Sequence, residues 1–366
     1  MSFRRLQTEN CLYFYSKDGE VCIISLYVDD LIIAGSTKAV TTMVKQRLSQ
    51  RYSMKDLGNV DEILGCRVQV NSLLGTVTIQ QHKYTAGLLE KYLDTDMKSA
   101  DTPADKSIIL SQSHEPENEE EQAFMATIPY REVIGSLLWL SLGTRPDIAY
   151  AVSQVAKFCS NPGPEHWKAV IRILRYLHGT RTLGLTYSAD SMDKIEEVTT
   201  VIASSDSLVP EGYVDADYAR DVESRRSVTG FLFFLAGAPI SWQTRQQPSV
   251  ALSTMESEFM AACAAAQESV WLLQLLKEFT CQFIHPLIIW EDNKSCIAYS
   301  KNSTNHQRTK HISARYHFIR ELVEQQVIQL TAIPSAENIA DLMTKPLDNK
   351  TFTRLRGKFM TIMDLA

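Results

Sequence analysis

The sequence has neither a recognisable secretory signal nor an apolar run long enough to cross a membrane. No apolar segment follows the basic residues Arg4 and Arg5 before the polar residues 7–10 begin, whereas a signal peptide needs such a segment. The most apolar early run, residues 21–35, is interrupted at its centre by Asp29 and Asp30, and a membrane helix needs about 20 consecutive apolar residues. These absences predict an intracellular protein without membrane contact.

Cysteine pairs with the spacing of a metal site are also missing. The seven cysteines are scattered, odd in number and free of any C-x-x-C motif, so we expect reduced thiols with neither a zinc site nor a disulfide framework. A basic excess is absent too, because 37 Lys and Arg stand against 43 Asp and Glu. The formal charge of −6 does not indicate nucleic-acid binding but leaves it open, since a local basic face can suffice.

The apolar content is sufficient for two or three globular domains. Of the 366 residues, 45% are hydrophobic, which is an ordinary share for a folded chain. Early in the chain, short strands flank an Asp18-Gly19 turn, which is typical of a hairpin. A helix is predicted over residues 37–52, strands over 60–80, and a second helix over 83–93.

A polar segment and three helices are expected next. Residues 95–126 carry a cluster of five glutamates and predict a solvated linker. Three helices are predicted over residues 129–179, the last of them over 164–178. This last helix carries a basic stripe formed by Lys168, Arg172 and Arg175. The stripe is either a solvated face or a ridge that follows phosphates, and charge alone does not decide between them.

From residue 212 the pattern becomes β-β-β-α-β-α-α-β-α. Its longest helix is predicted over residues 254–279, where apolar side chains recur along one face. The fold class is therefore α/β in the broad α+β sense. We expect a mixed β-sheet flanked by helices in this half and a helical connection before it.

Four carboxylates form the strongest chemical signal in this half. Asp215 lies in the first predicted strand, Glu256 in the first turn of the long helix, Asp292 at the end of an apolar strand, and Asp341 at the start of the last helix. Mg²⁺ prefers oxygen ligands, and two such ions about 3.5–4 Å apart support in-line hydrolysis of phosphodiesters. Four carboxylates on separate elements are consistent with such a site.

Each of the four also has a structural interpretation. Glu256 completes a Ser253-x-x-Glu256 capping box and so fits a residue that only caps its helix. Asp292 and Asp341 fit ordinary acidic residues at helix N-termini. Asp215 is harder to explain in this way, because Asp is rare inside strands and costly to bury. Taken together on this pattern, the four favour a site.

Several motifs in this half form a recognisable set. They are Tyr213-Val-Asp-Ala-Asp-Tyr-Ala219, Arg225-Arg-Ser-Val-Thr-Gly-Phe231, Val250-Ala-Leu-Ser-Thr-Met-Glu-Ser-Glu-Phe259, Glu291-Asp-Asn293, Arg308-Thr-Lys-His-Ile312 and Ala340-Asp-Leu-Met-Thr-Lys-Pro346. Together they resemble the ribonuclease H domain of copia-type retrotransposon Pol polyproteins, and an insect member of that family looks most similar. Upstream, Tyr27-Val-Asp-Asp30 resembles the reverse-transcriptase palm motif. Two further motifs resemble the connecting region of the same polyproteins, namely Tyr130-Arg-Glu-Val-Ile-Gly-Ser136 and Thr144-Arg-Pro-Asp147.

The resemblance implies a reaction and its residues. Asp215, Glu256, Asp292 and Asp341 correspond to the metal-binding D-E-D-D set of ribonuclease H, and the neighbouring Asp217 and Glu258 are given no role. The implied activity is hydrolysis of the RNA strand of RNA–DNA hybrids with two Mg²⁺ ions, for which Mn²⁺ is a substitute. We expect the backbone of the hybrid to contact two basic clusters, namely Lys168, Arg172, Arg175, Arg308 and Lys310.

The resemblance also implies a polymerase remnant. Asp29 and Asp30, adjacent at a hairpin turn, suit Mg²⁺ binding, although an ordinary Asp-rich turn is the simpler interpretation without the flanking matches. A palm needs a further aspartate from an upstream strand, and the chain begins 28 residues before Asp29. We therefore expect no independent polymerase activity.

The expected organisation has four parts: a partial palm and thumb over residues 1–96, an acidic linker and helical connection over 97–208, a ribonuclease H-like domain over 209–350, and a tail over 351–366. The resemblance also implies assembly with other retrotransposon Pol or capsid proteins, in the cytoplasm, virus-like particles or nucleus. Two other functions stay open. One is a decayed or co-opted copy that binds nucleic acid without cleaving it. The other is an integrase or transposase, which the D-E-D-D order argues against.

Overall fold

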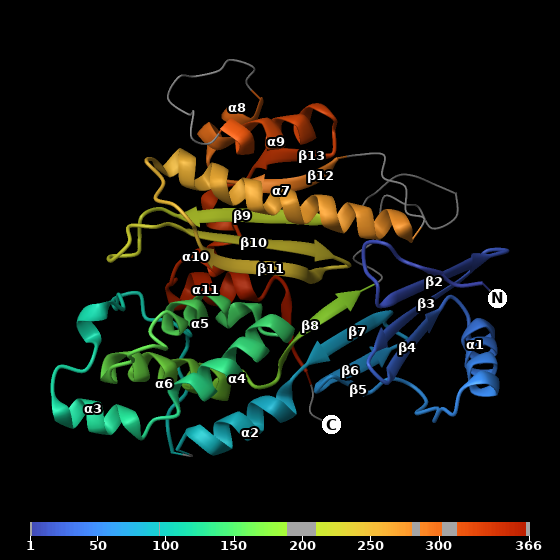
Figure 1. Cartoon of the computed structure of the whole chain (residues 1–366), viewed down its shortest axis with the longest axis horizontal. Helices are drawn as coiled ribbons and strands as arrows, with labels where there is room; N and C mark the ends of the chain where they lie inside the picture. Colours follow the sequence, from blue (N-terminus) through green and yellow to red (C-terminus); the bar gives the residue numbers. More distant parts are fainter. Residues whose placement is uncertain (1, 95, 189–209, 280–285, 302–312, 364–366) are drawn as a thin grey trace.

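The computed structural model describes residues 2–94, 96–188, 210–279, 286–301 and 313–363. Three β-sheets follow one another along the molecule, and Figure 1 shows the sheet nearest the N-terminus at one end and helices α3 to α6 gathered below the third sheet. The α/β class expected from the sequence is confirmed. Arg308 and Lys310, two of the expected nucleic-acid contacts, lie outside the described residues.

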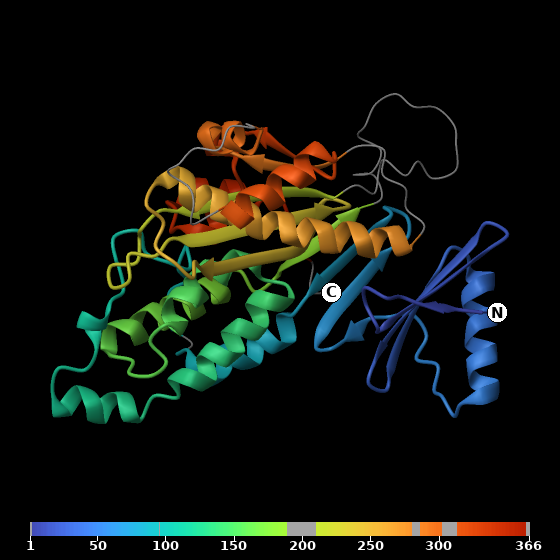
Figure 2. The same ribbon diagram turned by 45° about the horizontal axis from the view of Figure 1, so that its top comes forward.

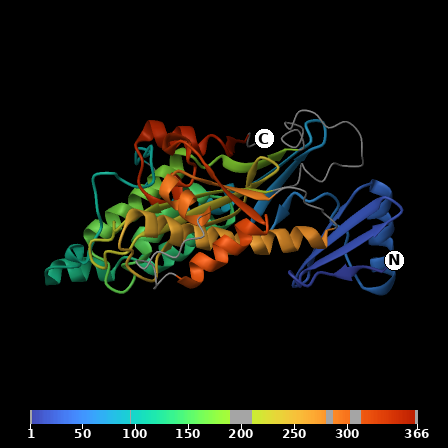
Figure 3. The ribbon, with the colours of Figure 1, turned by 90° about the horizontal axis from the view of Figure 1, so that it is seen from above.

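The first sheet is an antiparallel meander with one covering helix. Its strands lie in chain order and are β1 (Arg4–Arg5), β2 (Leu12–Lys17), β3 (Glu20–Tyr27) and β4 (Asp30–Gly35). The predicted hairpin joins β2 to β3, with positive φ at both Asp18 and Gly19. Helix α1 (Lys38–Arg51) buries Val40 and Val44 against the sheet. Seen from above in Figure 3, this sheet stands at the end of the molecule away from α3.

The second sheet joins parts of the chain that are far apart in sequence. Its order is β14-β8-β7-β6-β5, and all its neighbouring strands are antiparallel. The strands are β5 (Glu62–Ile63), β6 (Cys66–Asn71), β7 (Thr76–Gln80), β8 (Leu183–Ser188) and β14 (Met360–Ile362). One sheet therefore contains strands from the expected palm and thumb, the connection and the tail, and crosses the boundaries between them.

Helices fill the connection. They are α3 (Glu119–Ala126), α4 (Tyr130–Gly143), α5 (Ala149–Ala156) and α6 (Pro164–Gly179), with the short 3₁₀ turns η1 (Gln112–His114) and η2 (Pro146–Ile148). Helix α2 (His82–Tyr92) precedes them, at the end of the expected palm and thumb. The three helices predicted over residues 129–179 are confirmed. The acidic linker differs from expectation, because three of its five glutamates, Glu119, Glu120 and Glu121, form the first turn of α3. Asn118 caps that helix, and acidic residues in a first turn are favoured by the helix dipole.

The third sheet is mixed and covered on both faces. Its order is β11-β10-β9-β12-β13. The strands are β9 (Glu211–Asp217), β10 (Val228–Leu235), β11 (Ala238–Gln246), β12 (Leu287–Glu291) and β13 (Ile328–Ala332). β9, β10 and β11 are antiparallel, whereas β12 runs parallel to both β9 and β13.

Alternation along β10 shows how the two faces are buried. Phe231 and Phe233 pack with the helices α7 (Thr254–Glu278), α8 (Lys294–Lys301) and α9 (Ser313–Glu324). Leu232 and Phe234 point to the other face, where they share a core with the connection helices, α10 (Asp341–Thr344) and α11 (Asn349–Arg356). The turn η6 (Ser335–Glu337) precedes α10.

The long helix α7 is the main cover of the third sheet. The expectation that no apolar run is long enough to cross a membrane is wrong for this helix, which is long and apolar enough by length and composition. Most of it is buried, and its packing against the sheet accounts for its apolar side chains. Figure 2 shows its C-terminal end extending toward the first sheet. There, Glu278 accepts hydrogen bonds from the backbone N–H groups of Gln7 and Thr8, both at 2.7 Å. Glu278 therefore ties the first sheet to the helix.

A buried ion pair joins the connection to the C-terminal helix. Arg145 and Asp147 have side chains only 2% and 0% exposed, and Arg145 donates to both Asp147 oxygens at 2.9 and 2.8 Å. The Tyr176 hydroxyl of α6 also donates to Asp147. Arg356 of α11 donates to the Tyr176 hydroxyl at 2.8 Å. The network therefore links η2, α6 and α11.

Candidate active site

Asp215 is placed by the centre of the third sheet. It lies inside β9, opposite Gly230 of β10, and is 2% exposed. Gly230 lets α10 approach the sheet closely, because a Cβ atom there would lie 2.5 Å from Cβ of Met343 and 2.6 Å from Cγ2 of Thr344. This close approach brings the Thr344 hydroxyl to Asp215, to which it donates a hydrogen bond. The carboxylate is thus oriented from the α10 side.

Asp292 is brought beside Asp215 by parallel pairing. Trp290 of β12 pairs with Tyr213 of β9. Asp215 lies two residues beyond Tyr213 in β9, and Asp292 directly follows the last residue of β12. The parallel pairing therefore brings the end of β12 beside Asp215, and the two carboxylates lie close together. Unlike Asp215, Asp292 is only half-buried, which leaves the cluster open at this point.

The glutamate that completes the cluster is Glu258, not Glu256. Glu256 is the third residue of α7, and its carboxylate reaches back to accept the backbone N–H of Leu252 at 2.8 Å. Its own N–H donates to the N-cap hydroxyl of Ser253 at 3.1 Å. Glu256 thus bonds the N-terminal end of α7, although its carboxylate accepts from the residue before the N-cap. Glu258, two residues on, lies on the face that continues to Ala262 and Ala265 in the core against the sheet.

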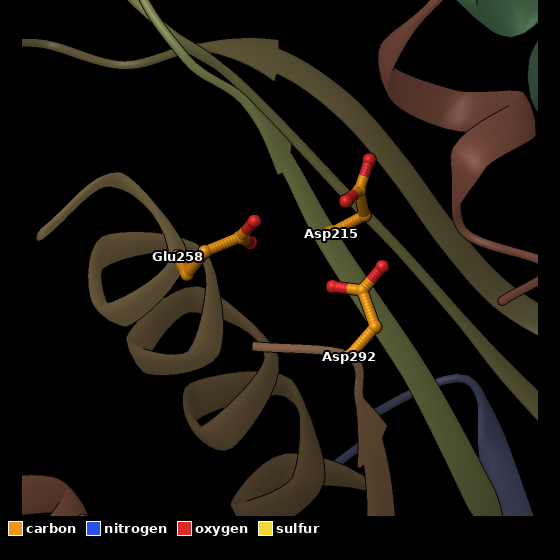
Figure 4. A group of neighbouring side chains, drawn as sticks. All are labelled: Asp215, Glu258 and Asp292. Atoms are coloured by element: carbon orange, nitrogen blue, oxygen red, sulfur yellow. The ribbon is translucent and has the colours of Figure 1, made fainter. Parts of the chain in front are cut away.

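Asp215, Glu258 and Asp292 converge from three elements. One potential ligand atom from each lies within 4.8 Å of the others, and Figure 4 shows the three side chains directed toward one another. Glu258 is 7% exposed, and its Oε2 atom has no hydrogen-bond partner among the described residues. Carboxylate oxygens are the ligands that Mg²⁺ and Mn²⁺ prefer, so this donor set fits a divalent cation.

Two carboxyl groups in and beside the cluster have raised pKa values. Burial raises the pKa of the Glu258 carboxyl well above its usual value, and neighbouring acidic charges, that of Glu291 first, raise it further. Burial and Asp215 also raise the pKa of Asp341, against the opposing effect of Lys345. An opposite charge beside a carboxylate favours its ionised form, so a divalent cation bound here would lower both pKa values.

Asp341 lies next to this group but meets a different partner. It begins α10 and is 8% exposed. Lys345 Nζ lies 2.7 Å from Asp341 Oδ1 and 3.4 Å from Asp215 Oδ2. The four expected acids are therefore arranged as a close group of two, Asp215 and Asp292, with Asp341 held beside Asp215 through a lysine and Glu256 turned away.

Asp29 and Asp30 lie apart from the cluster. They are exposed at the turn between β3 and β4, where Val28 has a positive φ of 51°. Within the described part of the chain, the one group of three acidic or other metal-ligating side chains that close together is Asp215, Glu258 and Asp292. Among the described residues, Asp29 and Asp30 therefore have no third metal-ligating side chain beside them.

The basic stripe of α6 contacts the chain itself. Arg172 donates to the Thr102 carbonyl at 3.2 Å and pairs with Asp105 at 3.0 Å. Arg175 donates to the Lys98 carbonyl at 2.6 Å, and Lys168 pairs with Glu165 at 2.6 Å. Two of the three side chains, Arg172 and Arg175, hold the polar linker against α6, whereas Lys168 is exposed. Contact between the stripe and nucleic acid stays a prediction.

Glu258 and Lys345 belong to the site but are not among the residues predicted from the sequence. A signal for Glu258 was available, because Ser253 and Glu256 already account for a capping box, and Glu258 precedes Ala262 and Ala265 at helical spacing. Lys345 lies four residues after Asp341, a spacing at which opposite charges pair on a helix. Nothing in the sequence indicates that Lys345 would also reach Asp215.

Comparison with known proteins finds a matching family model and several relatives of the chain. Residues 1–106 match the family model described as reverse transcriptase (RNA-dependent DNA polymerase). The chain is 38% identical to the retrovirus-related Pol polyprotein from transposon TNT 1-94 of Nicotiana tabacum, over 96% of this chain and 25% of that protein. It is 30% identical to a transposon Ty5-1 protein of Saccharomyces cerevisiae, over 73% of this chain and 80% of that protein.

A solved structure also aligns with the chain. It is the N-terminal RNase H domain of a Mycobacterium tuberculosis protein, fused to maltose-binding protein. The alignment covers 41% of this chain and 97% of that chain at 12% identity, with a TM-score of 0.29.

The chain belongs to the family of copia-type retrotransposon Pol polyproteins, as its relatives over most of its length show. It spans about a quarter of the length of the tobacco polyprotein that it matches. These relatives come from a plant and a yeast, so the particular similarity to an insect element stays a prediction.

Proposed function

We propose that residues 209–350 hydrolyse the RNA strand of RNA–DNA hybrids with the help of divalent cations, and that Asp215, Glu258 and Asp292 hold one of these ions. The observation that carries the proposal is the convergence of three carboxylates from β9, α7 and the end of β12 to within 4.8 Å. The motifs shared with ribonuclease H domains of the family supply the substrate class. The orphan Oε2 atom of buried Glu258 supports a cation as the missing partner.

The chain contributes position and charge to this reaction. A bound Mg²⁺ would supply Lewis acidity and lower the pKa of a water molecule. The Thr344 hydroxyl orients Asp215, and the packing of α7 on β9 holds Glu258 in a buried position. Asp292 is the more accessible member and lies where a phosphate of the substrate would approach. Such fixed carboxylates need no rearrangement during the reaction, which is the basis of electrostatic catalysis.

We propose in addition that this chain alone has no polymerase activity. Asp29 and Asp30 are exposed on a hairpin turn, and within the described residues they are not part of a group of three metal-ligating side chains. Their arrangement supports an inherited motif rather than a polymerase site. The place of action, inside the cell, and assembly with other Pol or capsid proteins are proposed from family membership alone.

The experiment that tests the nuclease proposal compares two glutamates on one helix turn. The purified chain is incubated with a labelled RNA–DNA hybrid and Mg²⁺, and cleavage rates are measured for the wild type, Glu258→Gln and Glu256→Gln. Glu258→Gln should lower the rate by at least about 100-fold, the upper end of the loss seen when the support of a metal site is removed. Glu256→Gln should remain close to wild type, because an amide oxygen can still accept the Leu252 N–H.

Thermal unfolding of both variants controls for folding, and an RNA–RNA duplex controls for the substrate. If Glu256→Gln abolishes cleavage while Glu258→Gln retains it, the role expected from the sequence is right and the geometric assignment is wrong. If the wild type binds the hybrid but does not cleave it, the non-catalytic scaffold is the better description of this chain.

A further inference from the structure

Lys345 is a cation built into the acidic cluster. Its ammonium nitrogen lies 2.7 Å from Asp341 Oδ1 and 3.4 Å from Asp215 Oδ2. The lysine follows α10 directly, and the side chain is 29% exposed. The two carboxylates are far more buried, at 11% and 3% side-chain exposure for Asp341 and Asp215. The positive charge is therefore held by two buried acids, while its stem has a route to solvent.

Asp215 belongs to two groups at once. One of its oxygens takes part in the close group with Glu258 and Asp292. Its Oδ2 atom meets the Thr344 hydroxyl and the Lys345 ammonium. The ammonium thus lies beside the proposed cation site, on the side of Asp341. A second divalent ion, about 3.5–4 Å from the first, would have to share Asp215 and bind Asp341 in the same place.

We propose that Lys345 occupies the position of the second divalent cation, so that an ion binds between Asp215 and Asp341 only after the ammonium withdraws. This inference rests on the proposed function, because it concerns the second ion of the same site. The chain should then bind one divalent ion strongly and a second one weakly. Withdrawal is feasible because a lysine ammonium sits on a flexible four-carbon stem that is already partly exposed.

The first test removes the charge and keeps the stem. The full chain is titrated with MnCl₂ by calorimetry, for the wild type, Lys345→Met and the matched control Lys350→Met, which changes an exposed lysine of α11. Lys345→Met should bind the second Mn²⁺ at least about tenfold more tightly, since a unit charge a few ångströms away opposes a cation strongly. Lys350→Met should match the wild type. Adding Asp341→Asn to Lys345→Met should remove the gain.

The second test uses the wild type alone, so that it is independent of how the variant folds. Lysines are acetylated briefly with and without saturating Mn²⁺ and quantified by mass spectrometry. Labelling of Lys345 should rise several-fold with Mn²⁺, because the ammonium leaves its two acids, whereas labelling of Lys350 should not change. Labelling of Lys345 that is unaffected by saturating Mn²⁺ would overturn the inference.

The results separate this inference from the proposed function. If the wild type cleaves hybrids and binds one ion, but Lys345→Met leaves the second affinity unchanged, the inference fails and the function stands. If the wild type cleaves nothing but Lys345→Met gains an ion that Asp341→Asn removes, the inference stands and the function fails. If neither protein binds Mn²⁺, both are wrong.

Discussion

Replacing Asp147 by Asn should destabilise the protein more than any change in its surface ion pairs. The substitution keeps the shape of the side chain but removes the charge that pairs with Arg145. Both side chains are almost completely buried. Burial alone would raise the pKa of Asp147, but the charge and hydrogen bonds of Arg145 outweigh it and hold the pKa below its usual value. The carboxylate is therefore the ionised partner on which the buried guanidinium depends.

The expected loss in the free energy of unfolding depends on the buried Arg145 guanidinium that the substitution leaves without a counter-charge. Arg145 would keep its bonds to the Thr180 carbonyl at 3.0 Å and hydroxyl at 2.7 Å, but no buried negative charge would remain opposite it. Leaving one partner of a buried pair without its counter-charge typically costs about 3–5 kcal/mol. The Tyr176 hydroxyl would also lose an ionised acceptor, so we expect a loss near the upper end of that range.

Urea unfolding followed by both fluorescence and circular dichroism measures this loss. The control is Glu132→Gln, which breaks the exposed pair of Lys91 and Glu132, and which should leave the midpoint unchanged because surface pairs contribute little. The double replacement Arg145→Met with Asp147→Leu should be more stable than Asp147→Asn, since it leaves no unpaired charge. A loss under about 1 kcal/mol for Asp147→Asn, typical of a surface pair, would refute the reasoning.

Two further predictions concern the third sheet and its neighbouring loop. Gly230→Ala should destabilise the protein by about 1–3 kcal/mol, as overpacking does, and should slow cleavage by pushing Thr344 away from Asp215. An unchanged unfolding midpoint would contradict the close contact. Burial opposes ionisation of Asp221, but hydrogen bonds from Lys157 and Ser224 outweigh it and lower its pKa to about 2. Because the folded value lies below the unfolded one, this contribution to stability is complete above about pH 4 and is lost as the pH falls toward 2. Asp221→Asn should flatten the decline of Tm over that interval, and parallel wild-type and variant curves would exclude the effect.

Local patterns were sufficient to predict most elements of the fold. The helices over residues 129–179, the long α7 and the succession of strands and helices along the C-terminal half depend on turn residues, caps and apolar periodicity, all of which are local. The glutamates of the linker were misjudged for a local reason as well. Asn118 caps α3, and this favourable first turn outweighs the tendency of a charge block to stay solvated.

The site residues also divide into those that local sequence patterns predict and those that depend on tertiary packing. Asp215 and Asp292 could be placed because strand ends and strand interiors are readable from sequence. Glu256 and Glu258 are two residues apart on a helix, and only the rotation of α7 against the sheet decides which carboxylate faces Asp215. The contacts of the basic stripe could not be predicted because they are distant in sequence. The linker carbonyl groups that accept hydrogen bonds from Arg172 and Arg175 lie 70 and 77 residues earlier in the chain.

The pairing of β8 between β7 and β14 has a consequence for how this chain can be divided. A nick between β8 and β9 would yield two fragments, yet the second fragment would still supply β14 to the first, so the fragments should stay together. Expressing either fragment by itself would instead leave a strand edge bare, and bare edges invite aggregation. The two halves of the chain should therefore be purified and degraded together.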